Sequence, residues 1–181
     1  MNAVGIIVEY NPLHNGHIHH IKEAKRLTNA DVVIAVISSN FTQRGEPAII
    51  DKKSRTISAL ENGVDLVVEL PFLYSVESPN MFAFGALSIL NDLGVKNVVF
   101  GIDEYDTKTF METCEKKQFS SPRLDEMIQE YISKGYAYSE AKSLGLQAIN
   151  DFYLELPNDI LGYAIIKTIN EQKMNITPIA I

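Results

Sequence analysis

The stretch "AVGIIVEYNPLHNGHIHHIKEAKRL", Ala3–Leu27, decides the fold. It opens with a short, almost uninterrupted apolar run, Ala3–Glu9, which is typical of a strand covered on both faces. A turn containing a proline follows, and from Gly16 to Leu27 apolar residues recur at three-residue steps, as on one face of a helix. A strand, a turn and a helix in this order predict the first half of a βαβ unit.

The same alternation continues to Asp103. Apolar runs rich in Val and Ile predict three more strands, at Asp31–Ser38, Asp65–Leu70 and Asn97–Ile102. Helical patterns lie between these runs: one spans Lys52–Asn62 and is stopped by Gly63, and one begins at Ser78-Pro79 and is stopped by Gly94. Because strands joined by helices cross over with a right-handed turn, the pattern predicts a doubly wound parallel sheet.

After Asp103 the pattern is helical, with helices expected at 121–135, at 139–151 and, beginning at Pro157, in "PNDILGYAIIKTINEQ". A last strand is expected in "ITPIAI", 176–181. We therefore expect one α/β domain over 1–181, Rossmann-like, with about five strands. Its core would comprise 1–103 and 156–181, and 104–155 would be an added helical segment. The chain ends inside an apolar run, which suggests the first part of a longer protein.

Composition limits the possible functions. The 181 residues are 46% hydrophobic and 22% charged, as in ordinary globular domains. Cys114 is the only cysteine, so no intrachain disulfide can form, and neither a signal peptide nor a membrane span is evident. We therefore expect a cytoplasmic protein without a membrane partner.

The net charge of −7 argues against a surface that binds nucleic acid everywhere. A local basic patch stays open in the first third, at Lys22, Lys25, Arg26, Arg44, Lys52, Lys53 and Arg55.

All four histidines lie between positions 14 and 20, where the first strand leads into the first helix. Ligands of open α/β sheets bind at the carboxyl ends of strands, where unpaired N–H groups of helix N-termini attract anions. Gly16 would let the backbone approach such a ligand, and His14 and His17 could donate hydrogen bonds to phosphate oxygens. His19 and His20 are expected on the outer face of the helix or its flank, without an assigned role.

Two other interpretations of the cluster stay open. The histidines could be structural or merely exposed. His14, His17 and His20 could also bind a metal, but no cysteine is near and the acidic residues fall at irregular offsets, so no metal site is predicted. A Walker-type phosphate loop is excluded, because the chain has no G-x-x-x-x-G-K-[ST] string.

The string H-x-G-H at 14–17, directly after the first strand, resembles the signature of the HxGH nucleotidyltransferase superfamily. Longer strings narrow the resemblance to the tRNA(Met) cytidine acetate ligase family. They are "VEYNPLHNGH", "SSNFTQRGEPAIIDKKSR", "ALENGVDLVVELPFLYS", "FAFGALSILNDLGVKNVVFG" and "LPNDILG". They occur in order from Gly5 to about Gly162, with a weaker stretch between Glu104 and Leu154.

The resemblance implies a nucleotide-binding catalytic domain and a two-step reaction. Acetate and ATP, the latter with Mg²⁺, would give acetyl-adenylate and pyrophosphate. The acetyl group would then pass to N4 of the wobble cytidine of elongator tRNA(Met). Binding of the tRNA is expected to need a C-terminal part of the family that this chain lacks. That part supplies a further nucleotide-binding arginine in the family. The chain also has Ile102 and Asp103 where the family usually has Ser-Glu.

The family's site residues carry over position by position. The implied ATP-binding residues are Ile7, Val8, Glu9, Tyr10, Asn11, Pro12, Leu13, His14, Asn15, Gly16, His17, Ile18, His19, His20, Gly101 and Asn158. The expected catalytic residues are His14, His17 and Arg44. His14 and His17 would contact the triphosphate, and we expect Arg44 to meet an anion, either the substrate carboxylate or a tRNA phosphate.

Each of the remaining assignments has a simpler alternative. Gly101 could be a strand-end turn glycine, Asn158 a helix cap and Arg44 half of a surface salt bridge. Glu69 could orient Arg44 or a histidine, or could be a solvated strand end. We predict that Phe82 and Phe84 belong to the core.

Two other functions stay open. The chain could be a small-molecule nucleotidyltransferase that joins ATP or CTP to a phosphorylated metabolite. It could also be a non-catalytic module that senses a nucleotide or binds RNA.

Overall fold

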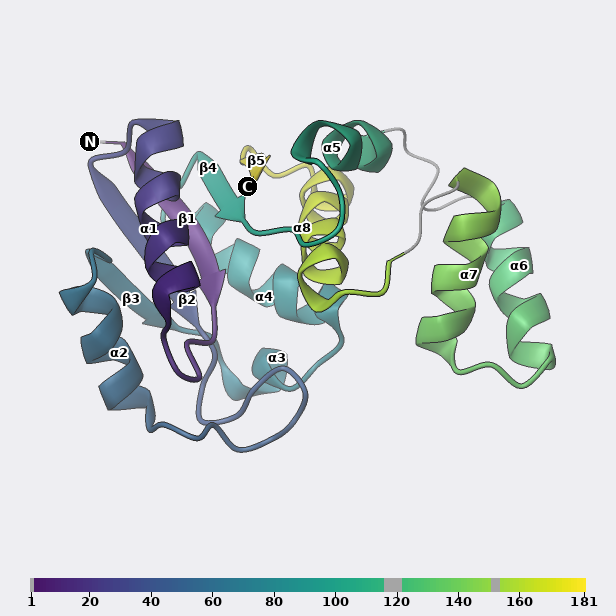
Figure 1. Ribbon diagram of the computed structural model, residues 1–181, viewed down its shortest axis with the longest axis horizontal. Helices are drawn as coiled ribbons and strands as arrows, with labels where there is room; N and C mark the ends of the chain where they lie inside the picture. Colours follow the sequence, from purple (N-terminus) through teal and green to yellow (C-terminus); the bar gives the residue numbers. More distant parts are fainter. Residues whose placement is uncertain (1, 116–121, 151–153) are drawn as a thin grey trace.

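The computed structural model describes residues 2–115, 122–150 and 154–181. At its centre lies a parallel sheet of five strands in the order β3-β2-β1-β4-β5 (Figure 1). The strands are β1 (Ala3–Val8), β2 (Val32–Ile37), β3 (Leu66–Glu69), β4 (Asn97–Phe100) and β5 (Thr177–Ala180). The strand order reverses between β1 and β4, so the carboxyl ends of these two strands border the crevice where ligands of such sheets bind.

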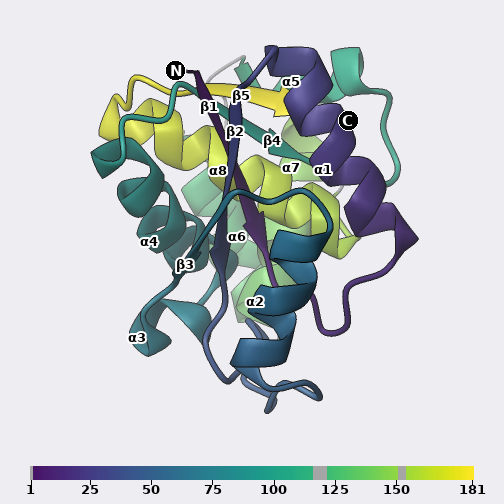
Figure 2. The same ribbon diagram turned by 90° about the vertical axis from the view of Figure 1, so that its left-hand side faces the viewer.

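Helices cover both faces of the sheet (Figure 2). Residues of α1 (Asn15–Thr28) and α2 (Lys52–Glu61) share one hydrophobic core with β1 and β2. Residues of α4 (Pro79–Asp92) and α8 (Pro157–Gln172) share a second core with the opposite face. Alternate residues of β1 divide between the two cores, with Ile6 in the first and Ile7 in the second. Burial on both faces explains why the strand reads as a continuous apolar run.

Gly162 lets α8 lie close to β4. A β carbon at this position would lie 2.7 Å from Cε2 of Phe100, the last residue of β4. Any side chain there would therefore push the helix away from the sheet. Because α8 lies so close, its first turn reaches the carboxyl edge of the sheet.

The remaining helices are α3 (Phe72–Ser75), α5 (Thr107–Glu115), α6 (Pro122–Ser133) and α7 (Tyr138–Asn150). α5 packs on α8 and β5, and Phe110 of α5 is fully buried. α6 and α7 pack against each other and stand beside the α/β body (Figure 1). Leu124 and Ile128 of α6 flank Gly145 of α7, where no larger residue would fit without a shift.

The sequence predicted this fold class correctly, including the five parallel strands. Gly63 and Gly94 have positive φ and follow the ends of α2 and α4, as expected. α3 and α5 were not predicted individually. The expected first residue of the helix at 121–135 and the expected last residue of the helix at 139–151 lie outside the described residues. The division into a core and a helical segment at 104–155 stays a prediction. No helix within the described ranges is long and apolar enough to cross a membrane.

Candidate nucleotide-binding site

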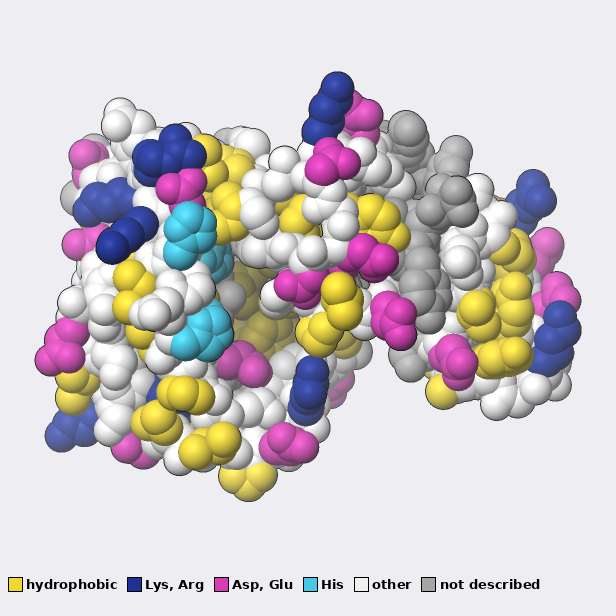
Figure 3. All heavy atoms as spheres, in the orientation of Figure 1, with side chains coloured by type: hydrophobic (Ala, Val, Ile, Leu, Met, Phe, Trp, Pro, Cys, Tyr) yellow, Lys and Arg dark blue, Asp and Glu magenta, His cyan; other side chains and the backbone are white. Residues whose placement is uncertain are grey.

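An open cavity of about 990 Å³ lies at the carboxyl edge of the sheet. Its walls come from the β1–α1 loop, the loop after β2, the end of β4 and the first turns of α4 and α8. Histidine side chains border the hollow on one side (Figure 3). The cavity is at the large end of the range for small-molecule sites, so a nucleotide with a second small substrate is within its capacity.

Two histidines build the first turn of α1. His14 is the N-cap residue, and its Nδ1 accepts a hydrogen bond from the Gly16 N–H at 3.1 Å. His17 Nδ1 accepts from the His14 N–H at 3.2 Å, so the two side chains form a reciprocal capping box. The rings stack with centroids 3.7 Å apart. Because each Nδ1 accepts a hydrogen bond, each neutral ring carries its proton on Nε2, which is free to act as a donor.

Gly16 leaves room for the capping ring of His14. A β carbon at position 16 would lie 3.0 Å from Cε1 and 3.1 Å from Nδ1 of His14, so the ring would have to shift by a few tenths of an ångström. No acidic residue lies in the first turn of α1, so the positive end of the helix dipole is not neutralised locally. An anion is the ligand that this turn favours.

His17 is neutral at physiological pH. Burial, followed by the neighbouring His14 and His20, lowers its pKa to about 4. Its ring lies 4.9 Å from the ring of Tyr10, centroid to centroid. The Tyr10 side chain is fully buried, and burial raises the pKa of its hydroxyl. A neutral donor in a partly desolvated site can stabilise phosphate charge without proton transfer.

We expected His20 on the outer face of α1 or its flank, but its side chain turns toward the sheet. Its Nε2 donates a hydrogen bond to the Val99 carbonyl oxygen of β4 at 2.9 Å, and burial lowers its pKa. The buried face of α1 includes Ile21 and Ala24, and His17 and His20 complete the i, i+3, i+4, i+7 stripe. That spacing was the overlooked signal. His20 Nδ1 is left as an acceptor, while His19 is exposed at the pocket's border.

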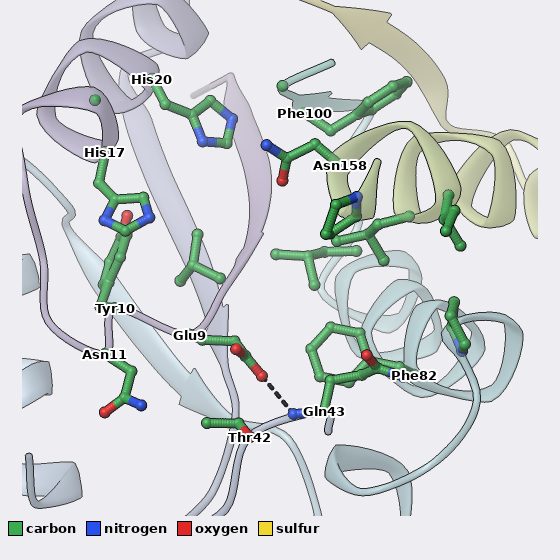
Figure 4. A pocket seen from close by; sticks show the side chains of 18 of the residues that line it. Glu9, Tyr10, Asn11, His17, His20, Thr42, Gln43, Phe82, Phe100 and Asn158 are labelled. Carbon is green, nitrogen blue, oxygen red and sulfur yellow. Dashed lines mark hydrogen bonds between the residues drawn. The ribbon is translucent and has the colours of Figure 1, made fainter. Parts of the chain in front are cut away.

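The opposite wall carries Gly101 and Asn158. A β carbon at Gly101 would meet no atom within 4 Å, so a side chain there would enter open space beside the pocket. Asn158 faces His20 (Figure 4), and its Nδ2 donates to Asp103 Oδ1 at 2.9 Å. Asn158 does not cap α8, because the N-cap residue is Leu156. The capping alternative is therefore wrong.

Sequence reasoning missed Asp159, which shapes this wall from inside. Its side chain is fully buried and accepts hydrogen bonds from the N–H groups of Asp103 at 2.8 Å and Glu104 at 3.3 Å. The loop after β4 is thereby fixed to the first turn of α8. An acidic residue near a helix N-terminus is too common in sequences to have indicated this contact.

Arg55 is buried, so it cannot belong to the surface basic patch that the sequence left open. Only 1% of the residue is exposed. Its guanidinium donates to the carbonyl oxygens of Glu9 (2.7 Å) and Ile50 (3.1 Å), to Ser38 Oγ (3.2 Å) and to the Ser39 carbonyl. Within the described residues no carboxylate lies within 4 Å of it. Arg55 thus joins the ends of β1 and β2 to the loop that precedes α2.

Further contacts attach the loop after β2, residues 38–51, to the β1–α1 loop. Glu9 Oε1 accepts from the Gln43 N–H at 2.5 Å (Figure 4). Asn11 Oδ1 accepts from the Ile49 N–H at 2.7 Å. Arg44 borders the pocket with an exposed side chain, and no ion pair involves it in the part of the chain that is described. Its catalytic role stays a prediction.

Glu69 is a solvated strand end. Its Oε2 lies 2.7 Å from the Nζ of Lys52, and both side chains are partly exposed. It orients neither Arg44 nor a histidine.

The pocket brings together most of the expected site residues. Lining it are Ile7, Val8, Glu9, Tyr10, Asn11, Pro12, His14, Gly16, His17, His19, His20, Arg44, Gly101 and Asn158. Leu13, Asn15 and Ile18 are not part of the lining. Phe82, correctly predicted as buried, also borders the pocket, while Phe84 is half-buried. Among residues 2–115, 122–150 and 154–181, no group of three or more His, Cys, Asp or Glu side chains could hold a metal ion. The ATP-binding roles stay predictions.

Comparison with known proteins bears on this site. The tRNA(Met) cytidine acetate ligase of Caldicellulosiruptor saccharolyticus is 46% identical over 182 residues, which cover 100% of this chain and 46% of that protein. The ligase of the same name from Bacillus subtilis strain 168 is 43% identical, covering 93% of this chain and 42% of that protein. The chain therefore spans about half the length of the curated relatives that it matches.

A solved structure is similar over the same extent. The crystal structure of Thermotoga maritima TmcAL bound with alpha-thio ATP matches with a TM-score of 0.89 and 36% identity, covering 100% of this chain and 46% of that one. The resemblance drawn from the sequence strings is thus confirmed. The model of the HIGH Nucleotidyl Transferase family matches residues 1–181. The chain belongs to the HIGH nucleotidyl transferase family, and within it to the sequences that resemble the tRNA(Met) cytidine acetate ligases.

Proposed function

We propose that this chain is the ATP-binding catalytic part of an acetate ligase that acts on tRNA. One observation carries the proposal. His14 and His17 present two stacked Nε2–H donors over the N-terminus of α1, at the carboxyl edge of a sheet that matches an ATP-analogue-bound relative. Donors held this way are suited to phosphate oxygens. The names of the curated relatives support acetate and tRNA(Met) cytidine as substrates.

In the first step, a carboxylate oxygen of acetate would attack the α-phosphorus of ATP. A new oxygen–phosphorus bond forms, the bond to the β-phosphate oxygen breaks, and pyrophosphate leaves with the electron pair. No proton has to move, so positioning and charge stabilisation suffice. His14, His17 and the helix N-terminus would stabilise charge on the phosphates, and Arg44 would bind an anionic substrate group at the rim. Magnesium would be carried by the triphosphate, whose oxygens are the ligands that it prefers.

In the second step, N4 of the wobble cytidine of elongator tRNA(Met) would attack the acetyl carbonyl carbon. The bond from that carbon to the phosphate oxygen breaks, AMP leaves, and the nitrogen loses one proton. The adenosine of the intermediate would lie near Gly101 and Asn158, where the pocket wall is open beside the backbone. Acting on tRNA would place the protein in the cytoplasm.

Pyrophosphate exchange into ATP tests the proposal, using the full gene product as the cell makes it. Exchange should depend on acetate and magnesium. Exchange that needs a phosphorylated metabolite, or CTP in place of ATP, would indicate a small-molecule nucleotidyltransferase instead. Tight ATP binding without exchange in the presence of any acid would indicate a non-catalytic module. N4-acetylcytidine in tRNA(Met) should disappear from cells that lack the gene.

A further inference from the structure

The pocket has a second end that the nucleotide-binding residues do not account for. His20, Phe100 and Asn158 lie at one end, and Thr42, Gln43 and Phe82 lie at the other, with Glu9 and His17 between them (Figure 4). The loop after β2 and the start of α4 are joined at this second end, because Gln43 Nε2 donates to the Glu77 carbonyl oxygen at 2.6 Å.

Thr42 carries an unpaired hydroxyl at this end. The residue is 6% exposed and lines the pocket, and its Oγ1 has no hydrogen-bond partner among the described residues. Its backbone is fixed, since its N–H donates to the Glu46 carbonyl at 2.8 Å and its carbonyl accepts from the Gly45 N–H at 2.9 Å. A buried hydroxyl that borders a pocket and lacks a partner is suited to receive a polar ligand atom.

Neighbouring donors at this end are already engaged. The Gln43 N–H bonds Glu9, and the Gln43 side-chain amide bonds the Glu77 carbonyl. Two donors on this stretch of the loop keep spare capacity among the described residues. They are the Thr42 hydroxyl and the exposed guanidinium of Arg44, which lies two residues later at the border of the same pocket.

Charged and apolar groups both border this end. The carboxylates of Glu9 and Glu46 and the guanidinium of Arg44 line the pocket, and Glu9 Oε1 is already engaged by the Gln43 N–H. Phe82 and Pro79 provide apolar surface on the α4 side. A carboxylate with a short apolar tail matches this combination of one hydroxyl, a nearby guanidinium and an aromatic wall.

We infer that the Thr42 hydroxyl donates a hydrogen bond to the carboxylate of the acyl substrate, so that Thr42, Arg44 and Phe82 form the acyl-substrate end of the pocket. The inference rests on the proposed acetate-activating function. It adds a binding residue and divides the pocket into a nucleotide end and a carboxylate end.

Steady-state pyrophosphate exchange in the full gene product tests the inference, with Thr42→Val as the variant. Valine has nearly the same shape and lacks only the hydroxyl. We expect the KM for acetate to rise about tenfold to a hundredfold, as for loss of one hydrogen bond to a charged group. The KM for ATP, and the Kd for ATP measured by calorimetry, should stay within about twofold, which also shows that the variant is folded.

Two controls accompany the variant. Thr42→Ser keeps the hydroxyl and should keep the acetate KM close to that of the wild type. Thr168→Val removes another threonine that is also 6% exposed, but on α8 and outside the pocket lining, and should change neither KM.

The outcomes separate the inference from the function on which it rests. Acetate-dependent exchange in the wild type with an unchanged acetate KM in Thr42→Val would overturn the inference and leave the proposed function standing. A rise in the ATP KM in place of the acetate KM would also overturn it, since the hydroxyl would then serve the nucleotide. Absence of acetate-dependent exchange in the wild type itself would reject both.

Discussion

The two loops that border the pocket reach the same edge of the sheet by different means. The β1–α1 loop ends in a capping box whose hydrogen bonds join residues three or fewer apart. The loop after β2 is held by hydrogen bonds between residues far apart in the sequence: Gln43 and Glu9 are 34 positions apart, and Ile49 and Asn11 are 38 positions apart. The comparison teaches that a site built from local contacts leaves a motif in the sequence, whereas one built from distant contacts does not.

Arg55→Met should cause the largest loss of stability, because it removes the side chain that joins the loop after β2 to the end of β1. Methionine leaves the buried Ser39 carbonyl oxygen and the partly buried Glu9 and Ile50 carbonyl oxygens without their donor. We expect a loss of about 3–5 kcal/mol in the free energy of unfolding, measured by urea denaturation.

The matched control is Arg26→Met, whose arginine is exposed and pairs with Glu23 one helical turn away. That change should leave the free energy of unfolding nearly unchanged, because an ion pair in contact with solvent contributes little to stability. Equal losses in the two variants would show that Arg55 does not hold the two loops together.

His17→Ala tests the local loop. Loss of one preorganised donor typically costs about 10²–10³-fold in rate, so acetyl-adenylate formation should slow by this factor in single-turnover experiments. ATP affinity should fall far less, because the helix N-terminus and neighbouring backbone still bind the ground state. His20→Ala should mainly weaken ATP binding, since its ring lies at the nucleotide end of the pocket (Figure 4). A near-normal rate in His17→Ala, or an equally slow His20→Ala enzyme, would refute these assignments.

Gly101→Val tests the pocket wall that lies opposite both loops. A side chain at this position has free space on the protein side, so folding stability should change little. The branched side chain would occupy room that adenosine needs, and we expect ATP affinity to fall about tenfold or more, as for overpacking of about 1–3 kcal/mol. Isothermal titration calorimetry measures this effect, and an unchanged Kd would count against the nucleotide position.

The smallest predicted effect is a pH dependence that arises in the capping box. His17 has a folded pKa of about 4, below the ordinary value of 6.5. The unfolded chain therefore binds a proton here more readily, and the folded state loses stability as pH falls from above 6.5 towards 4. Between pH 7 and 5 we expect a loss of about 1 kcal/mol, allowing for a ring that is only half-buried. His17→Gln should lose less stability over this range. If its free energy of unfolding fell with pH in parallel with that of the wild type, His17 would not be the group responsible.

The sequence allowed prediction of most features that depend on local pattern, although α3 and α5 were not predicted individually. Val- and Ile-rich runs identified the five strands, and the position of H-x-G-H after the first strand identified the pocket wall. The direction of His20 follows the helical spacing of the buried face of α1 and was overlooked. The burial of Arg55 and the contact of Asp159 with the loop after β4 could not be predicted, because each depends on a partner 16 to 56 residues away. The unpaired hydroxyl of Thr42 could not be predicted either, because it depends on how the loop after β2 folds against Glu9.

A crystal structure of the full gene product with a non-hydrolysable ATP analogue tests the central claim most directly. We expect phosphate oxygens within about 3.2 Å of Nε2 of His14 or His17, a hydrogen-bond distance. The adenosine should lie between His20 and the wall formed by Gly101 and Asn158. A nucleotide on the opposite edge of the sheet, or phosphates out of reach of both histidines, would contradict it.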